Sequence, residues 1–179
     1  MFENNNDIIK PLKLDAPGKP SEMRRHCHKL AKKLANKVRE QLADSSKTLF
    51  VFVLRGAMVL YPAFVDEFED ASFCFTYSDY VTKLECTDFD TVVIVDTIVH
   101  SGKTLSKVKK LLQEKVTTQN WILAAAFSNN DKKEFLNENF DKVFCLLFMD
   151  NVGILVDIGA AFTNGDGVNK PVDYLLYKK

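Results

Sequence analysis

A carboxylate and a small-residue turn follow an apolar run in the stretch VVIVDTIVHSGKT, residues 92–104. Asp96 comes directly after the apolar residues, and Ser-Gly-Lys-Thr follows at 101–104, where a helix-like segment begins. Free N–H groups at a helix N-terminus attract anions, and Gly102 allows a phosphate to approach the backbone closely. Asp96 would accept hydrogen bonds from hydroxyls but would repel a phosphate. A ribose 5-phosphate, with a phosphate at one end and hydroxyls beside it, fits both features.

The Ser-Gly-Lys-Thr turn has two other interpretations. One is the nucleoside-triphosphate loop GxxxxGK[ST]. Gly102 and Lys103 match its end, but its first glycine would fall on Thr97, so we do not expect a Walker-type NTPase. The other is a plain turn that starts a helix and is capped by Asp96. The complete run of apolar strand, acid and small-residue turn favours the sugar-phosphate site over this second interpretation.

Apolar runs alternate with amphipathic segments along the chain. Strands are expected at residues 48–54, 72–84 (one or two strands), 91–95, 121–127 and 143–148. Helices are expected at residues 21–42 with Ser21 as the N-cap, 57–68, 103–115 and 131–139. This alternation predicts an α/β fold with a mainly parallel central sheet flanked by helices. Ligands of such sheets bind at the carboxyl ends of the strands, at residues 55–56, 96–104, 127–130 and from 150 onward.

The composition of the 179-residue chain indicates one globular domain, which we place at 21–179 behind an N-terminal arm at 1–20. Lys plus Arg equals Asp plus Glu at 24 each, so no bulk field favours nucleic acid, and we interpret the basic face of the first long helix as solvated. Four cysteines without a CxxC pair indicate reduced thiols. No apolar stretch has the length of a signal peptide or of a bilayer span, so a cytoplasmic protein is expected.

The stretch at 92–104 resembles the phosphoribosyl-diphosphate (PRPP) signature of the type I phosphoribosyltransferases. Other segments are similar to the uracil enzymes of that family. Leu-Arg-Gly-Ala at 54–57 resembles their Leu-Arg-Ala-Gly, and Tyr-Val-Thr-Lys-Leu at 80–84 resembles their Tyr-Tyr-x-Lys-Leu. VFCLLFMD at 143–150 is similar to their late strand ending on Asp, and GILVDIGAAFTNGDG at 153–167 occupies the place of their uracil-binding segment.

Several departures keep alternatives open. The single acid followed by Thr97 resembles the uracil enzymes, whereas His-Ser-Gly-Lys-Thr at 100–104 is closer to the purine-salvage hypoxanthine-guanine enzymes. The uracil family's Pro-Glu-Gly reads Ser-Asn-Asn at 128–130, and its Gly-x-Tyr-Arg hood segment is not recognisable. The alternatives are a 6-oxopurine enzyme, a PRPP- or nucleotide-sensing regulator of the same fold, and a non-catalytic member kept for protein interactions.

The resemblance implies substrates, roles and partners. The expected reaction transfers the phosphoribosyl group of PRPP to a nucleobase, with uracil preferred, giving UMP and pyrophosphate. Mg²⁺ would be carried by PRPP, with no metal ligand set in the protein. It also implies a short hood near residues 72–88 and in the C-terminal segment, and a homodimer or higher oligomer. Asp96 would bind the ribose hydroxyls, Arg55 would face the pyrophosphate, and Lys83 in the hood would neutralise the leaving group. The expected PRPP-binding residues are Arg55, Gly56, Asp96, Thr97, His100, Ser101, Gly102, Lys103 and Thr104. The expected base-binding residues are Ile158, Gly159, Asn164, Gly165 and Asp166.

Overall fold

A parallel sheet forms the centre of the protein. The structure, a computed structural model of the chain, describes residues 5–13, 20–42, 44–82 and 84–155. Within these ranges, five strands pair in parallel in the order β2-β1-β3-β4-β5. The strands are β1 (Thr48–Val53), β2 (Ser72–Thr76), β3 (Thr91–Val99), β4 (Asn120–Asn129) and β5 (Lys142–Met149). The α/β fold with a parallel central sheet is therefore confirmed.

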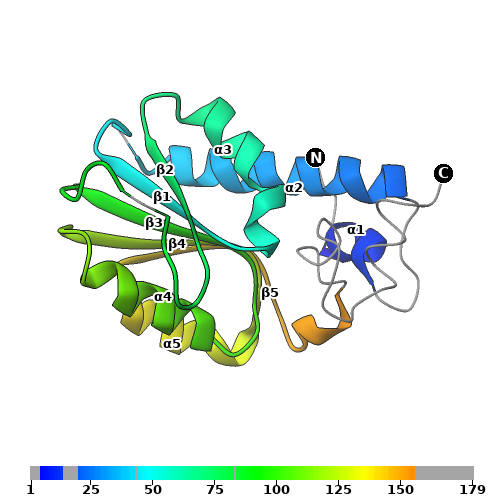
Figure 1. Ribbon diagram of the computed structural model, residues 1–179. Helices are drawn as coiled ribbons and strands as arrows, with labels where there is room; N and C mark the ends of the chain where they lie inside the picture. Colours follow the sequence, from blue (N-terminus) through cyan, green and yellow to red (C-terminus); the bar gives the residue numbers. More distant parts are fainter. Residues whose placement is uncertain (1–4, 14–19, 43, 83, 156–179) are drawn as a thin grey trace.

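Helices cover both faces of the sheet. In Figure 1, α2 and α3 lie on one face, and α4 and α5 lie on the other. These helices are α2 (Pro20–Arg39), α3 (Tyr61–Glu67), α4 (Lys103–Gln113) and α5 (Lys133–Asn139). Shorter elements are α1 (Asn5–Ile9), η1 (Lys10–Leu12), η2 (Gly56–Val59), η3 (Asn130–Lys132) and η4 (Val152–Ile154). Among the described helices, none is long and apolar enough to cross a bilayer.

The central strands are apolar along their whole length because both of their faces are buried. Every residue of β1 is buried, and its side chains alternate between two core clusters. Leu49 and Val51 pack towards α4, whereas Phe50 and Phe52 pack under α2 and α3. Phe50 lies within 4.6 Å, ring centre to ring centre, of Phe68. The abundant phenylalanines of this face thus fill the core, as the composition predicts.

The strand at 91–95 is longer than expected. β3 continues to Val99, because its pairing with β4 continues as far as Val99 opposite Ser128. Asp96 therefore lies inside the strand, three positions before its end, and not directly after it. The first long helix begins at Pro20, so Ser21 lies in its first turn and does not precede it. Both differences concern element ends, which depend on neighbouring elements more than on local sequence.

Residues 5–13 pack against the same body. Ile8 and Leu12 are buried in a third cluster that also contains Val152 and Leu155. Lys13 forms an isolated antiparallel bridge with Leu155. The division into an arm at 1–20 and a domain at 21–179 stays a proposal, as does the hood. The sheet takes up residues 72–76, so a hood near 72–88 can begin only after β2.

Candidate active site

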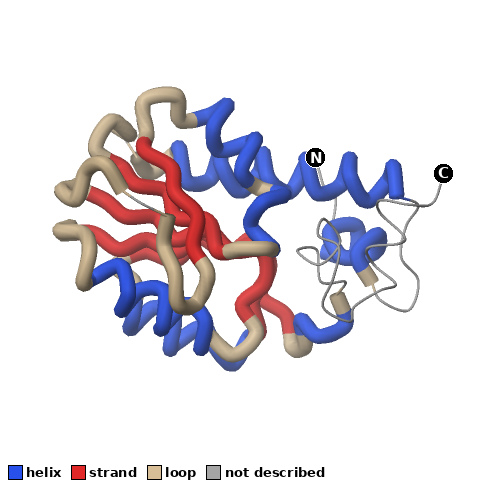
Figure 2. Tube along the Cα trace, viewed as in Figure 1, coloured by secondary structure: helices blue, strands red, loops and turns tan. Residues whose placement is uncertain are grey.

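A pocket of about 400 Å³ lies at the carboxyl ends of β1 and β3, where ligands bind in open parallel sheets. Figure 2 shows the segments that follow β1, β3 and β5 at one end of the sheet, towards the right of the view. Three stretches of chain line the pocket. They are residues 53–56 after β1, residues 96–98 with His100 and Thr104 after β3, and residues 152–153 with Leu155 after β5.

Asp96 is the carboxylate among the described lining residues of this pocket. Its side chain is only 9% exposed, and its Oδ1 accepts a 2.7 Å hydrogen bond from the N–H of Thr97. A buried carboxylate is stable only when such donors replace the lost water. The backbone bond fixes one carboxylate oxygen and thereby fixes how Asp96 is presented at the pocket wall.

The turn after β1 lies directly against the end of β3. A Cβ placed on Gly56 would overlap the hydroxyl of Thr97 and would lie 3.8 Å from Asp96 Oδ1. Gly56 therefore allows the turn to reach the β3 carboxylate. Arg55 precedes it as the N-cap of η2, is half-buried, and follows a cis peptide bond after Leu54. The close approach places the cation of Arg55 and the carboxylate of Asp96 in one pocket.

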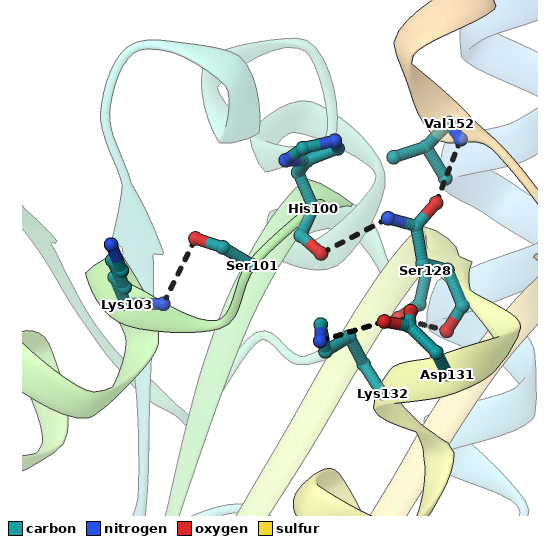
Figure 3. Close-up of polar contacts among 8 residues, drawn as sticks. His100, Ser101, Lys103, Ser128, Asp131, Lys132 and Val152 are labelled. Carbon is teal, nitrogen blue, oxygen red and sulfur yellow. Dashed lines mark hydrogen bonds and ion pairs between the residues drawn. The ribbon is translucent and has the colours of Figure 1, made fainter.

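The small-residue turn leads into α4 as its spacing predicts. Gly102 is the N-cap of α4 and has φ 76°, a left-handed conformation that glycine adopts without strain. It is buried, and a Cβ there would lie 2.6 Å from Phe135 of α5. Ser101 and Lys103 are exposed, and the Lys103 N–H donates to Ser101 Oγ at 3.4 Å (Figure 3). The turn therefore presents a helix N-terminus towards solvent beside the pocket.

A polar side chain of β4 holds the third stretch of the pocket lining, residues 152–153 with Leu155. Asn129, the last residue of β4, is buried, and its side chain hydrogen-bonds both His100 and Val152. Sequence reasoning placed residues 127–130 near the site but gave Asn129 no role, and it did not single out Val152 or Leu155. The signal available in the sequence was position alone, at the carboxyl end of a strand.

The pocket brings together six of the predicted site residues: Arg55, Gly56, Asp96, Thr97, His100 and Thr104. The other turn residues, 101–103, lie between two of its lining residues along the chain. Lys83 and the expected base contacts at Ile158, Gly159, Asn164, Gly165 and Asp166 lie outside the described residues. The role of each predicted residue stays a prediction.

Comparison with protein families decides the class. The sequence profile of the phosphoribosyl transferase domain matches residues 23–163. The chain belongs to this phosphoribosyltransferase family. The family inferred from the resemblance of residues 92–104 to a PRPP signature is therefore confirmed. A comparison with curated protein sequences gives no match.

Solved structures have the same fold at low sequence identity. The AQ2163 protein from Aquifex aeolicus is similar at a TM-score of 0.60 and 14% identity, covering 71% of this chain and 75% of that chain. A hypoxanthine-guanine-xanthine phosphoribosyltransferase has a TM-score of 0.51 and 15% identity, covering 68% and 74%. The orotate phosphoribosyltransferase from Aeropyrum pernix has a TM-score of 0.50 and 16% identity, covering 66% and 68%. These similarities show the type I phosphoribosyltransferase fold.

Proposed function

We propose that this phosphoribosyltransferase transfers the phosphoribosyl group of PRPP to a nucleobase, with uracil as the acceptor and UMP and pyrophosphate as products. The observation that supports the proposal most is the shared pocket. It contains a half-buried cation at Arg55 and a buried carboxylate at Asp96, and the helix N-terminus after Gly102 lies beside it. PRPP carries a diphosphate, ribose hydroxyls and a 5-phosphate, and each matches one of these three features.

Each feature has a separate role in this proposal. The N-terminus of α4, with the hydroxyls of Ser101 and Thr104, holds the 5-phosphate, because N–H groups without intrahelical partners and the helix dipole favour an anion. Asp96 accepts hydrogen bonds from the ribose hydroxyls and so orients the sugar. Arg55 and the N–H groups that follow it face the pyrophosphate. Thr97 supports this arrangement by holding Asp96 through its N–H.

The reaction breaks the bond between C1 of the ribose and the pyrophosphate oxygen and forms a bond from C1 to a ring nitrogen of the base. The electron pair of the broken bond leaves with the pyrophosphate, and the attacking nitrogen of the base gives its proton to solvent water. Positive charge builds up on the ribose in an oxocarbenium-like transition state. No covalent nucleophile is required. Positioning and electrostatic stabilisation of the leaving group by Arg55 supply the catalysis.

Magnesium would arrive with PRPP. Asp96 is the sole Asp or Glu among the described residues that line the pocket. One carboxylate fits an ion that takes most of its ligands from phosphate oxygens and water, which is the usual arrangement for Mg²⁺. When bound, the ion would supply positive charge to the pyrophosphate.

A 6-oxopurine acceptor is the second candidate. The turn His-Ser-Gly-Lys-Thr at 100–104 resembles the purine-salvage enzymes more than the uracil enzymes. The wall formed by Val152, Gly153 and Leu155 would face the base. It has no polar side chain and suits a planar base of either size. The expected base contacts at 158–166 lie beyond the described residues, so the preference for uracil rests on the sequence resemblance.

The test is an assay of pyrophosphate release from Mg-PRPP with uracil, hypoxanthine, guanine and orotate offered separately. Release with uracil alone supports the proposal, and release with hypoxanthine or guanine alone assigns the second candidate. Calorimetric binding of Mg-PRPP without turnover would indicate a PRPP-sensing regulator. Absence of both binding and release would overturn the assignment of the pocket.

A further inference from the structure

The side chain of Asn129 joins two walls of the pocket from behind. Its Nδ2 donates to the carbonyl oxygen of His100 at 3.1 Å, and its Oδ1 accepts from the N–H of Val152 at 2.8 Å. Figure 3 draws these two bonds at the His100 carbonyl and at the Val152 nitrogen. His100 and Val152 line the pocket, whereas Asn129 does not. Asn129 is 8% exposed, so water cannot easily replace either bond.

Asn129 lies where the backbone pairing of β4 ends, so a side chain is needed to bond the segments that follow. The paired residues of β3 and β4 end with Val99 opposite Ser128, one residue before His100 and Asn129. On the other side, Asn129 is the last residue of β4 paired with β5, opposite Met149. Beyond these points the backbone ladders stop and the chains separate into the pocket turns. The side-chain amide of Asn129 takes the place of backbone pairing on both sides. Its Nδ2 donates to the carbonyl of His100, and its Oδ1 accepts from the N–H of Val152.

The primary amide of Asn129 satisfies both partners at once. A carbonyl oxygen can only accept and a backbone N–H can only donate, so the partners fix which atom of the amide faces each of them. Carboxylate oxygens at this position could accept from Val152 but could not donate to His100. An aliphatic side chain of similar size would leave both backbone groups buried without a partner.

We infer that Asn129 is a positioning residue that fixes two segments of the pocket relative to each other. Through His100 it holds the phosphate turn, residues 101–104, and through Val152 it holds the wall formed by Val152, Gly153 and Leu155. This inference rests on the proposed function for its substrate, but the coupling of the two walls can be measured without any ligand. If it is correct, disturbing Asn129 loosens two segments that are far apart in the sequence, and it weakens PRPP binding although Asn129 does not touch the pocket.

Asn120, which is exposed, provides a control on the same strand. It is the first residue of β4, and its Nδ2 donates to the carbonyl of Asp90, the residue before β3, at 3.1 Å. The same strand thus carries an asparagine-to-carbonyl bond towards β3 at each end, and only the one at Asn129 is next to the pocket. The variants to compare are Asn129→Asp, Asn129→Leu and Asn120→Asp.

The ligand-free measurement is amide hydrogen exchange by NMR. In the wild type, we expect the Val152 amide to exchange as slowly as amides of β5, although it lies beyond the end of that strand. The reporter for the turn is the Ser106 amide, which donates to the Gly102 carbonyl. In Asn129→Leu, exchange should accelerate both at Val152 and at Ser106. In Asn129→Asp, it should accelerate at Ser106 while Val152 stays protected. Fast exchange of Val152 in the wild type would overturn the inference even if no variant folds.

The binding measurement is calorimetry with Mg-PRPP. We expect Asn129→Asp to raise the Kd about tenfold, as loss of a buried hydrogen bond typically does, and Asn120→Asp to leave it within about twofold. If both variants bind as the wild type does, the inference is wrong and the proposed function stands. If the wild type itself binds no PRPP, the proposed function fails, and the exchange measurement still decides whether Asn129 couples the two walls.

Discussion

Gly56 and Thr97 are in such close contact that no side chain fits between them. A Cβ on Gly56 would overlap the Thr97 hydroxyl, and Thr97 is only 4% exposed within β3. The turn that carries Arg55 is therefore seated on the strand that carries Asp96. This contact sets the separation of the cation and the carboxylate that the proposed reaction uses.

Substitution of Gly56 by Ala should disturb this contact. We expect Gly56→Ala to lower the free energy of unfolding by about 1–3 kcal/mol, as overpacking commonly does, and to weaken Mg-PRPP binding. Denaturant titration and calorimetry would measure the two effects. The double variant Gly56→Ala/Thr97→Ala removes the overlapping hydroxyl and should recover part of the stability. Wild-type stability and binding in Gly56→Ala would show that the contact does not constrain the pocket.

Gly102 is restricted by its backbone and by a neighbour. Its φ of 76° costs an L-residue about 1–2 kcal/mol, and a Cβ would also press on the Phe135 ring. We predict that Gly102→Ala destabilises the fold by at least this amount and weakens binding of PRPP. In the double variant Gly102→Ala/Phe135→Leu, only the steric part should be relieved. Equal stability of Gly102→Ala and the wild type would contradict the conformation at this turn.

The cysteines should differ strongly in reactivity. Burial raises the pKa of Cys27 and Cys74 to about 12, and that of Cys145 to about 11, whereas Cys86 is exposed. A raised pKa keeps a thiol protonated, and only the thiolate attacks an aromatic disulfide reagent. At pH 8 we therefore expect one fast-reacting thiol in the native protein, which Cys86→Ser removes, and four in denaturant. More than one fast thiol in the native wild type would disprove this burial pattern.

Asp96 and His100 should contribute differently to catalysis. Asp96 is buried with its carboxylate held in the pocket, whereas the His100 side chain is exposed and its carbonyl makes the structural bond. We predict that Asp96→Asn lowers kcat/KM more than His100→Ala, because the amide keeps the size of the side chain but loses its charge. Steady-state assays of pyrophosphate release would compare them. The opposite order would mean that the assigned roles are wrong.

The sheet and the site were predictable from the sequence to different degrees. The apolar runs around Phe50 and Ile94 indicated buried strands, because both faces of those strands are covered and no polar alternation interrupts them. The end of β3 was not predictable, since pairing with β4 carries the strand past Asp96 to Val99. The residues of β3 alone do not indicate how far such pairing extends.

The phosphate turn was recognisable because its chemistry is local: a glycine with positive φ precedes a helix. The back of the pocket was not recognisable, because it depends on contacts between distant segments. Asn129 gains its role from His100 and Val152, which lie 29 and 23 residues away in the chain. Leu155 joins the wall through a cluster that includes Leu12 from the N-terminal segment.

Above all, we propose that the pocket lined by Arg55 and Asp96, beside the 101–104 turn, binds PRPP and releases pyrophosphate from it. The most direct measurement is pyrophosphate release from Mg-PRPP in the presence of uracil, with Asp96→Asn as the control that keeps the size of the pocket. We expect release that depends on uracil and falls sharply in Asp96→Asn. Absence of pyrophosphate release with every base in the panel would contradict this claim, even if PRPP binds.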